Sequence, residues 1–248
     1  MTVPFPTRKQ EEWRYADLDA LRPVWEQFAE PRTLTIGAGE TFEDVWLPTA
    51  DDVHVRRMQI ALEPGARTRL FVLNTAPVYG RIELDVSLDE GSEFDLFGAN
   101  IGTGLSTNEI VTVVKHIGVG GRSRQTIRSV LNGKATGSYL GRVEVARGAQ
   151  QTDADQSVKA MLLDRGATAN CKPELEIFAD DVKCAHGATV GELDAMQLFY
   201  AESRGLDPVS ARALLLEGFV MGLWDGIENA AQHESIATAA KDALRRVV

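Results

Sequence analysis

The middle of the chain alternates apolar and polar side chains with a period of two residues. Residues 81–89 (RIELDVSLD) place four aliphatic side chains on one face and four acidic or hydroxyl side chains on the other. Residues 138–146 (SYLGRVEVA) repeat this pattern, as do residues 174–180 (ELEIFAD), with Leu175 and Ile177 on the apolar face. Successive side chains of a β-strand point to opposite faces, so each run predicts a half-buried strand.

Short turns that contain glycine recur between these runs. The turns around Gly148, Gly166 and Gly187 lie 18 and 21 residues apart. Short strands separated by turns at a nearly constant spacing, with no helix between them, indicate a β-solenoid. Asn132-Gly133 is one candidate hairpin turn, and the sequence leaves its role open.

Helical patterns flank the strand-rich region on both sides. Residues 10–28 carry apolar side chains three or four positions apart, which predicts a short helix that packs its aromatic side chains on the main body. Pro31 closes this segment. The chain therefore divides into an N-terminal helical segment (1–31), a β-solenoid core (32–190) and a C-terminal helical subdomain (191–248).

The C-terminal subdomain is expected to contain three helices. Gly205 ends the first, Asp207-Pro208 fits the N-cap and first position of the second, and residues 227–244 form the third. Apolar residues at helical spacing are Leu193, Met196 and Tyr200 in the first helix and Leu215 and Phe219 in the second. Such a tail can pack on its own core or dock a partner, and the pattern leaves both interpretations open.

Composition and charge narrow the class of protein. The net charge of −10 comes from 36 acidic and 26 basic residues, which disfavours nucleic acid and anionic membranes as partners. The sequence has no run of about 18 apolar residues and no apolar stretch typical of a secretory signal near its start. We therefore expect a cytoplasmic protein in which Cys171 and Cys184 are free thiols.

Cys184 and His186 offer the most specific chemistry in the sequence. If residues 182–190 are extended, both side chains share one face and lie roughly 7 Å apart along the strand. A thiol and an imidazole at this separation can hold one soft metal ion or iron–sulfur fragment when a partner completes the coordination. Free cysteines are also frequent in protein cores, and the spacing alone favours a structural role for both residues.

Other catalytic patterns give weaker signals. The sequence contains no phosphate-binding G-x-x-x-x-G-K-[ST] motif, no G-x-S-x-G, no H-E-x-x-H and no C-x-x-C pair. Asp153 and Asp155 would share a face if extended, as the acidic clusters of carbohydrate-active β-helix enzymes do. The same two residues also fit a polar turn between coils, and we favour that interpretation.

Three stretches resemble one known family in the same order along the chain. Residues 162–194 (LLDRGATANCKPELEIFADDVKCAHGATVGELD) resemble the signature of SufD proteins, subunits of the SUF iron–sulfur cluster assembly scaffold. Residues 6–18 (PTRKQEEWRYADL) and 129–157 (SVLNGKATGSYLGRVEVARGAQQTDADQS) are similar to the same family. The resemblance implies a right-handed parallel β-helix, and the N-terminal helical region is unusually short for the family.

The resemblance also implies a function and partners. It indicates a scaffold subunit that is not an enzyme, pairs with a SufB-like paralogue and docks a SufC-like ABC ATPase through its C-terminal helices. A transient iron–sulfur cluster would form at the interface with the paralogue, with His186 matching the SufD histidine implicated there and Cys184 as its neighbour. The expected docking residues are Leu193, Met196, Tyr200, Leu215 and Phe219. A reduced flavin is expected in the whole complex and no tightly bound cofactor in the isolated chain.

Two other functions stay open at this point. One is a carbohydrate-active β-helix enzyme that uses Asp153 and Asp155. The other is a structural homodimer that pairs the edges of its solenoids without chemistry, and the isolated chain can form such a dimer under either scaffold interpretation. Co-purification with an ABC-type ATPase would separate the assembly scaffold from both alternatives.

Overall fold

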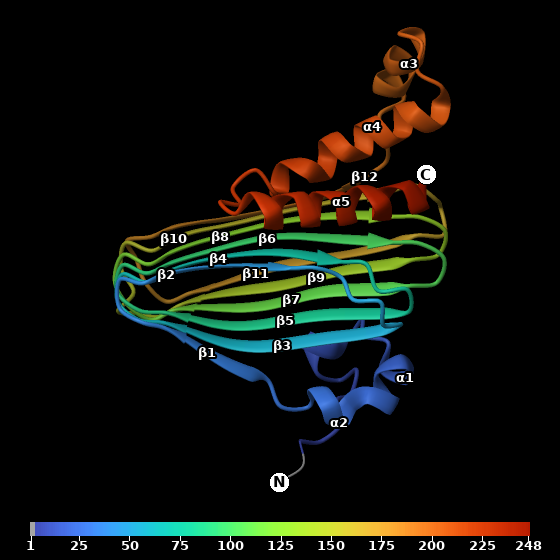
Figure 1. The fold of residues 1–248 in the computed structure, drawn as a ribbon. Helices are drawn as coiled ribbons and strands as arrows, with labels where there is room; N and C mark the ends of the chain where they lie inside the picture. Colours follow the sequence, from blue (N-terminus) through green and yellow to red (C-terminus); the bar gives the residue numbers. More distant parts are fainter. Residues whose placement is uncertain (1–2) are drawn as a thin grey trace.

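The computed structural model describes residues 3–248, and twelve strands within this range form two parallel six-stranded sheets that face each other (Figure 1). The first sheet contains, in spatial order, β1 (Arg32–Ile36), β3 (Val53–Leu62), β5 (Tyr79–Leu88), β7 (Thr107–His116), β9 (Thr136–Val145) and β11 (Thr168–Ile177). The second contains, from the same end, β2 (Thr41–Trp46), β4 (Arg67–Asn74), β6 (Glu93–Gly102), β8 (Arg122–Leu131), β10 (Asp153–Leu162) and β12 (Lys183–Gly191). Consecutive strands alternate between the sheets, so each pair of strands is one coil of a β-helix, as predicted.

The spacing of the coils differs from the spacing that the turns suggested. Arg32 pairs with Met58 in the first coils, 26 residues later, and Thr136 pairs with Thr168 in the last coils, 32 residues later. Gly148 and Gly166 lie in successive turns, at opposite ends of β10, and Gly187 lies inside β12. The intervals of 18 and 21 residues therefore measured half-coils, and the turn expected at Gly187 is wrong.

The alternating pattern places the core as predicted. The aliphatic side chains of β5 that point inward are all buried, and they pack between the two sheets with their counterparts from the other strands. Asn132-Gly133 lies in the turn between β8 and β9, which belong to different sheets, so it forms no hairpin. Ile177 is 39% exposed because the last coil has no further coil to cover it.

One corner of the β-helix is held by a repeated backbone contact. Gly39, Gly65, Gly91 and Gly120 adopt φ values of 62–71°, a left-handed conformation that glycine adopts without steric cost. Each donates its N–H to a carbonyl of the following coil, and Gln151, with φ of 61°, does the same in the last such turn. The turn glycines thus link successive coils where the strands themselves have ended.

The N-terminal segment packs on the outer face of the first sheet (Figure 1). It contains the short turns η1 (Glu11–Trp13), α1 (Leu18–Leu21), η2 (Arg22–Val24) and α2 (Trp25–Phe28). The single helix predicted for residues 10–28 is therefore wrong, because Asp17 caps a new helical start and Pro23 has no N–H to continue it. Trp13 and Trp25 are buried on the sheet as expected, and Glu11 reaches β11, where its Oε1 lies 2.6 Å from Lys172 Nζ.

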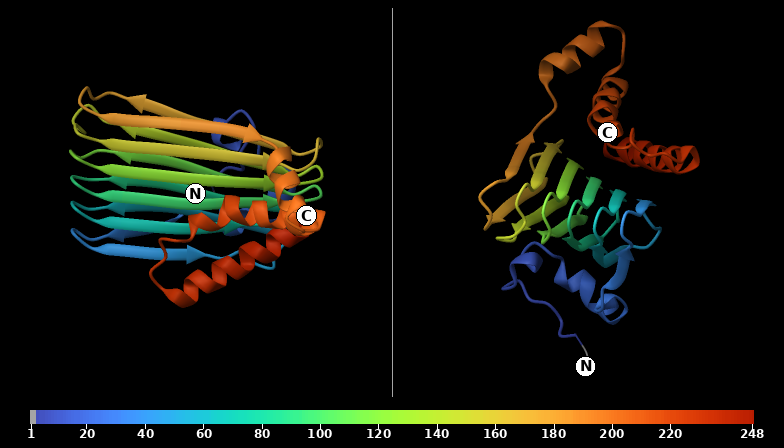
Figure 2. Two further views of the ribbon diagram at one scale, coloured as in Figure 1. Left: turned by 90° about the horizontal axis from the view of Figure 1, so that it is seen from above. Right: turned by 90° about the vertical axis from the view of Figure 1, so that its left-hand side faces the viewer.

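The C-terminal region forms α3 (Ala195–Ser203), α4 (Pro208–Val220), η3 (Met221–Leu223) and α5 (Ala230–Val247). Asp207 caps α4 as predicted, whereas the last helix begins at Ala230, after the cap Asn229. α5 and the end of α4 cover the outer face of the second sheet, while α3 stands away from both sheets (Figures 1 and 2). None of the helices within residues 3–248 combines the length and apolar content needed to cross a bilayer.

Candidate functional site at the open end of the β-helix

The last coil of the β-helix leaves two strand edges without a neighbouring strand. Within residues 3–248, β11 pairs with β9 alone and β12 pairs with β10 alone, and both strands lie at the same end of the stack (Figure 2). The outer edge of such a strand presents backbone N–H and C=O groups to whatever lies beside it. This end of the molecule is called the open end below.

Cys184 and His186 lie in β12, which is extended as the sequence predicted. Cys184 is in register with Ala154 of β10, and His186 is in register with Gln156. Ala154 and Gln156 are buried between the sheets, so both β12 residues occupy the inward phase of the last strand. Cys184 is half-buried against the core, whereas the His186 side chain is exposed at the open end.

Burial raises the pKa of the Cys184 thiol and of the Cys171 thiol. Both cysteines are free, and Cys171 lies on β11 in register with Tyr139. A thiol with a raised pKa is protonated at neutral pH, so it becomes a metal ligand only when the metal displaces its proton. The exposed imidazole of His186 is therefore the more accessible donor at this end.

A row of polar side chains runs inside the β-helix behind His186. The Thr112 hydroxyl donates to Gln125 Oε1 at 2.6 Å, and the Tyr139 hydroxyl donates to the same oxygen at 3.1 Å. Gln156 Nε2 in turn donates to the Tyr139 oxygen at 3.0 Å. All four side chains are buried. The sequence analysis missed them, although Gln156 falls in the inward phase of residues 153–162, where an apolar residue is the usual choice.

A second surface feature is an apolar groove on the helices that project from the β-helix. It has a volume of about 430 Å³ and lies between α3 and α4, next to the exposed side chains of both helices. The predicted docking residues that line it are Met196, Tyr200 and Leu215. Leu193 and Phe219 instead pack against the helix-covered core. Phe199, Val209 and Leu214 are exposed apolar residues of the same helices, at helical positions that the sequence analysis did not select.

Comparison with known proteins identifies the family. A family model described as SUF system FeS cluster assembly, SufBD core domain, matches residues 41–219. The chain belongs to the SufBD family. This agrees with the resemblance found in the sequence, and the matched range includes the open end and the groove.

Named relatives of this SufBD protein align with only part of their own length. An iron–sulfur cluster assembly SufBD family protein of Synechocystis sp. is 31% identical over 72% of this chain and 40% of the relative. The chloroplastic protein ABCI7 of Arabidopsis thaliana is 45% identical over 40% of this chain and 21% of the relative. SufD of Escherichia coli is 36% identical over 43% of this chain and 25% of the relative. The chain thus matches less than half of the length of each.

Asp153 and Asp155 of this SufBD protein lie on the outer face of β10. Both are exposed, and they are in register with Arg122 and Arg124 of β8. Opposite charges side by side on the outside of a sheet stabilise neighbouring strands modestly. This arrangement gives the carbohydrate-active interpretation no enclosed acidic site.

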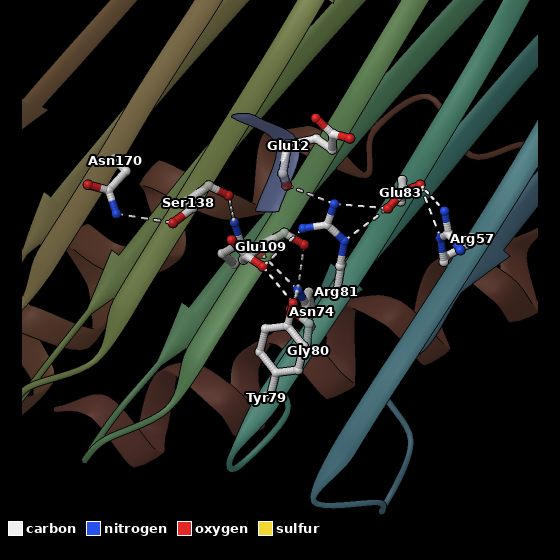
Figure 3. A network of polar contacts seen from close by, with 11 residues as sticks. Glu12, Arg57, Asn74, Tyr79, Gly80, Arg81, Glu83, Glu109, Ser138 and Asn170 are labelled. Atoms are coloured by element: carbon white, nitrogen blue, oxygen red, sulfur yellow. Dashed lines mark hydrogen bonds and ion pairs between the residues drawn. The ribbon is translucent and has the colours of Figure 1, made fainter. Parts of the chain in front are cut away.

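A cluster of buried charges lies under the N-terminal segment (Figure 3). Arg81 is fully buried, and its guanidinium contacts Glu109 Oε2 at 3.2 Å, Glu83 Oε2 at 2.9 Å and the Glu12 carbonyl at 2.9 Å. The Trp13 ring lies 3.6 Å from the same guanidinium. This group of residues, called the Arg81 cluster below, joins the N-terminal segment to β5 and β7.

Burial acts differently on the two acids of the Arg81 cluster. It raises the pKa of Glu109, even though Arg81 and the Tyr79 hydroxyl contact the carboxylate. Burial also opposes ionisation of Glu83, but Arg81 and Arg57 outweigh it and lower the pKa of Glu83. The cluster is covered by the N-terminal segment, so we assign it a structural role.

Proposed function

We propose that this chain is a scaffold subunit for iron–sulfur cluster assembly that presents His186 and Cys184 to a SufB-like partner. The observation that carries the proposal is the exposure of His186 on the last strand, next to a free strand edge. The cluster is the cargo of this site. One imidazole nitrogen and one thiolate are fewer than the four ligands of a tetrahedral iron, so the partner supplies the others.

The partner is expected to bind along the open end. Free edges of β11 and β12 can accept strands of another chain, and backbone hydrogen bonds would then hold the two subunits together. A similar β-helix is the natural partner, because its last coil would offer edges of the same kind. A homodimer that only serves a structural purpose would use the same edges, and the role of His186 distinguishes the two functions.

We further propose that the groove between α3 and α4 docks a SufC-like ATPase. The groove is lined almost entirely by apolar atoms, and exposed apolar patches of this kind mark interaction sites. Docking on helices that stand away from the β-helix leaves the open end free for the other partner. Movement of the ATPase subunits could then be transmitted to the coil that carries His186, because α3 follows β12 directly.

His186→Ala is expected to separate ligation from folding. Because the side chain is exposed, we expect the free energy of unfolding to change by no more than about 0.5 kcal/mol. Cluster assembly by the complex reconstituted with the SufB-like and SufC-like subunits should be lost, as measured by the iron, sulfide and visible absorption of the product. Thr189→Ala, an exposed substitution on the outward phase of β12, is the matched control and should assemble normally.

The ligand role would be wrong if His186→Ala assembled clusters in proportion to its folded fraction. Cys184→Ala should give a smaller loss than His186→Ala, because the half-buried Cys184 thiol also packs against the core. If both variants assembled normally while the complex still formed, the structural homodimer or heterodimer would be the better interpretation.

Tyr200→Asp is expected to weaken binding of the ATPase at least tenfold without unfolding the chain. The Tyr200 side chain is 60% exposed, so a carboxylate there places charge in the groove and leaves the core intact. Binding is measured by calorimetry with the purified ATPase. Glu202→Ala, on the opposite face of α3, is the control. Tight binding by Tyr200→Asp and by Leu214→Asp would contradict the assignment of the groove.

Point substitutions suit this test better than removal of the tail. α5 and the end of α4 cover Phe71, Ile101 and Val130 on the outer face of the second sheet. A chain without residues 192–248 would expose these side chains to water. Loss of ATPase binding by such a chain would then reflect the damaged sheet as well as the missing groove.

A further inference from the structure

Gln156 has one buried polar atom that needs a hydrogen-bond donor. The side chain is 1% exposed, and Nε2 donates to the Tyr139 oxygen at 3.0 Å. Oε1 is buried without a hydrogen-bond partner among residues 3–248. An unsatisfied buried amide oxygen costs about 1–3 kcal/mol, and most such atoms in folded proteins are paired.

The orientation of the Gln156 amide follows from the row of polar groups behind it. Tyr139 has one hydroxyl proton, which it donates to Gln125 Oε1. The Tyr139 oxygen can therefore only accept, so the amide nitrogen of Gln156 faces it, and Oε1 is the atom left free. The deeper part of the row thus fixes which end of Gln156 is available.

Two residues flank Gln156 in register along the sheet. Gln125 of β8 lies on one side, and His186 of β12 lies on the other. Side chains in the same phase of adjacent strands are about 4.8 Å apart, within reach of a hydrogen bond between long side chains. Gln125 Nε2 is itself without a partner, so it does not donate to Gln156 Oε1. The remaining donor beside this oxygen is the ring N–H of His186.

We propose that Gln156 is a positioning residue for His186: its Oε1 accepts the proton of one imidazole nitrogen and leaves the other nitrogen facing the open end as a ligand for iron. Such a contact fixes both the tautomer and the direction of the ring. This inference rests on the proposed function only for the identity of the metal. The hydrogen bond itself is a property of the isolated chain.

The tautomer of His186 is measured by nitrogen NMR on the full chain labelled at histidine, with the His186 signals assigned from the His186→Ala variant. In the wild-type chain we expect one tautomer to dominate. In Gln156→Leu the tautomer ratio should change at least about fivefold towards that of free histidine, as expected for loss of one ordinary hydrogen bond. Gln156→Glu keeps an acceptor at this position and should keep the wild-type tautomer.

Gln125→Leu is the matched control, because it removes a buried amide one strand deeper in the same row and should leave the tautomer of His186 unchanged. The proposal is overturned if the wild-type chain has the tautomer ratio of free histidine, a result that needs no variant to fold. It is also overturned if Gln125→Leu and Gln156→Leu change the ratio equally. Failure of His186 in cluster assembly would refute the proposed function and leave the hydrogen bond standing.

Discussion

Replacing Arg81 with methionine is expected to lower the free energy of unfolding by about 3–5 kcal/mol, the range found when one partner of a buried ion pair is removed. Arg81 is fully buried and contacts Glu83 and Glu109, and Glu109 is fully buried as well. Methionine fills much of the space but leaves both acids without this cation. The substitution also removes the hydrogen bond to the Glu12 carbonyl and the contact with the Trp13 ring.

Urea denaturation followed by circular dichroism measures this loss. Arg142→Met is the matched control: Arg142 is exposed and pairs with Glu144 on the outside of β9, and such pairs contribute about 0–1 kcal/mol. Because burial raises the pKa of Glu109, the difference between Arg81→Met and the wild-type chain should narrow as the pH falls and Glu109 becomes neutral. Equal losses for Arg81→Met and Arg142→Met would mean that the Arg81 cluster contributes little to stability.

Lowering the pH from 6.5 to 4 is expected to cost about 3 kcal/mol of folding free energy through His116 alone, at about 1.4 kcal/mol per pH unit. Burial lowers the pKa of His116 from 6.5 to about 4, because the ring is 1% exposed. Below pH 6.5 the unfolded chain binds a proton at this residue that the folded chain does not bind until about pH 4. Stability from the neutral ring is therefore complete above pH 6.5 and is lost as the pH falls.

His116→Gln isolates this effect from the titration of the carboxylates. Glutamine keeps a polar group near the Ser123 hydroxyl, which lies 2.9 Å from His116 Nε2, but it does not titrate. The free energy of unfolding of the wild-type chain should fall more steeply between pH 6.5 and 4 than that of the variant. Parallel curves for the two proteins would show that His116 binds its proton equally in the folded and unfolded chain.

The strands could be predicted from the sequence because their signal is local. The alternation in residues 81–89 depends only on which side chains meet the core, and the cap at Asp207 depends only on the next three residues. The length of a coil is different, because Arg32 meets Met58 through a contact 26 residues away. Turns with glycine occur at both ends of every coil, so their spacing alone does not give the full repeat.

The candidate site could be predicted only in part, for a related reason. The shared phase of Cys184 and His186 follows from their spacing, but the exposure of His186 depends on β12 being the last strand of its sheet. Gln156 reads as an ordinary polar residue until Tyr139 and Gln125 from other strands are beside it. The N-terminal helix failed because Pro23 interrupts an apolar spacing that otherwise suits a helix.

The attachment of the N-terminal segment to β11 bears on how the last coil moves. In a stack of coils each unit is stabilised by its neighbours, and the last unit has only one. Lys172 of β11 is tied to Glu11 from outside, although both side chains are partly exposed and the pair is worth about 0–1 kcal/mol. β12 is held along β10 alone among the strands of residues 3–248. Fraying and amide hydrogen exchange should therefore start at β12, and a subunit that binds there would slow the exchange of the strand that carries His186.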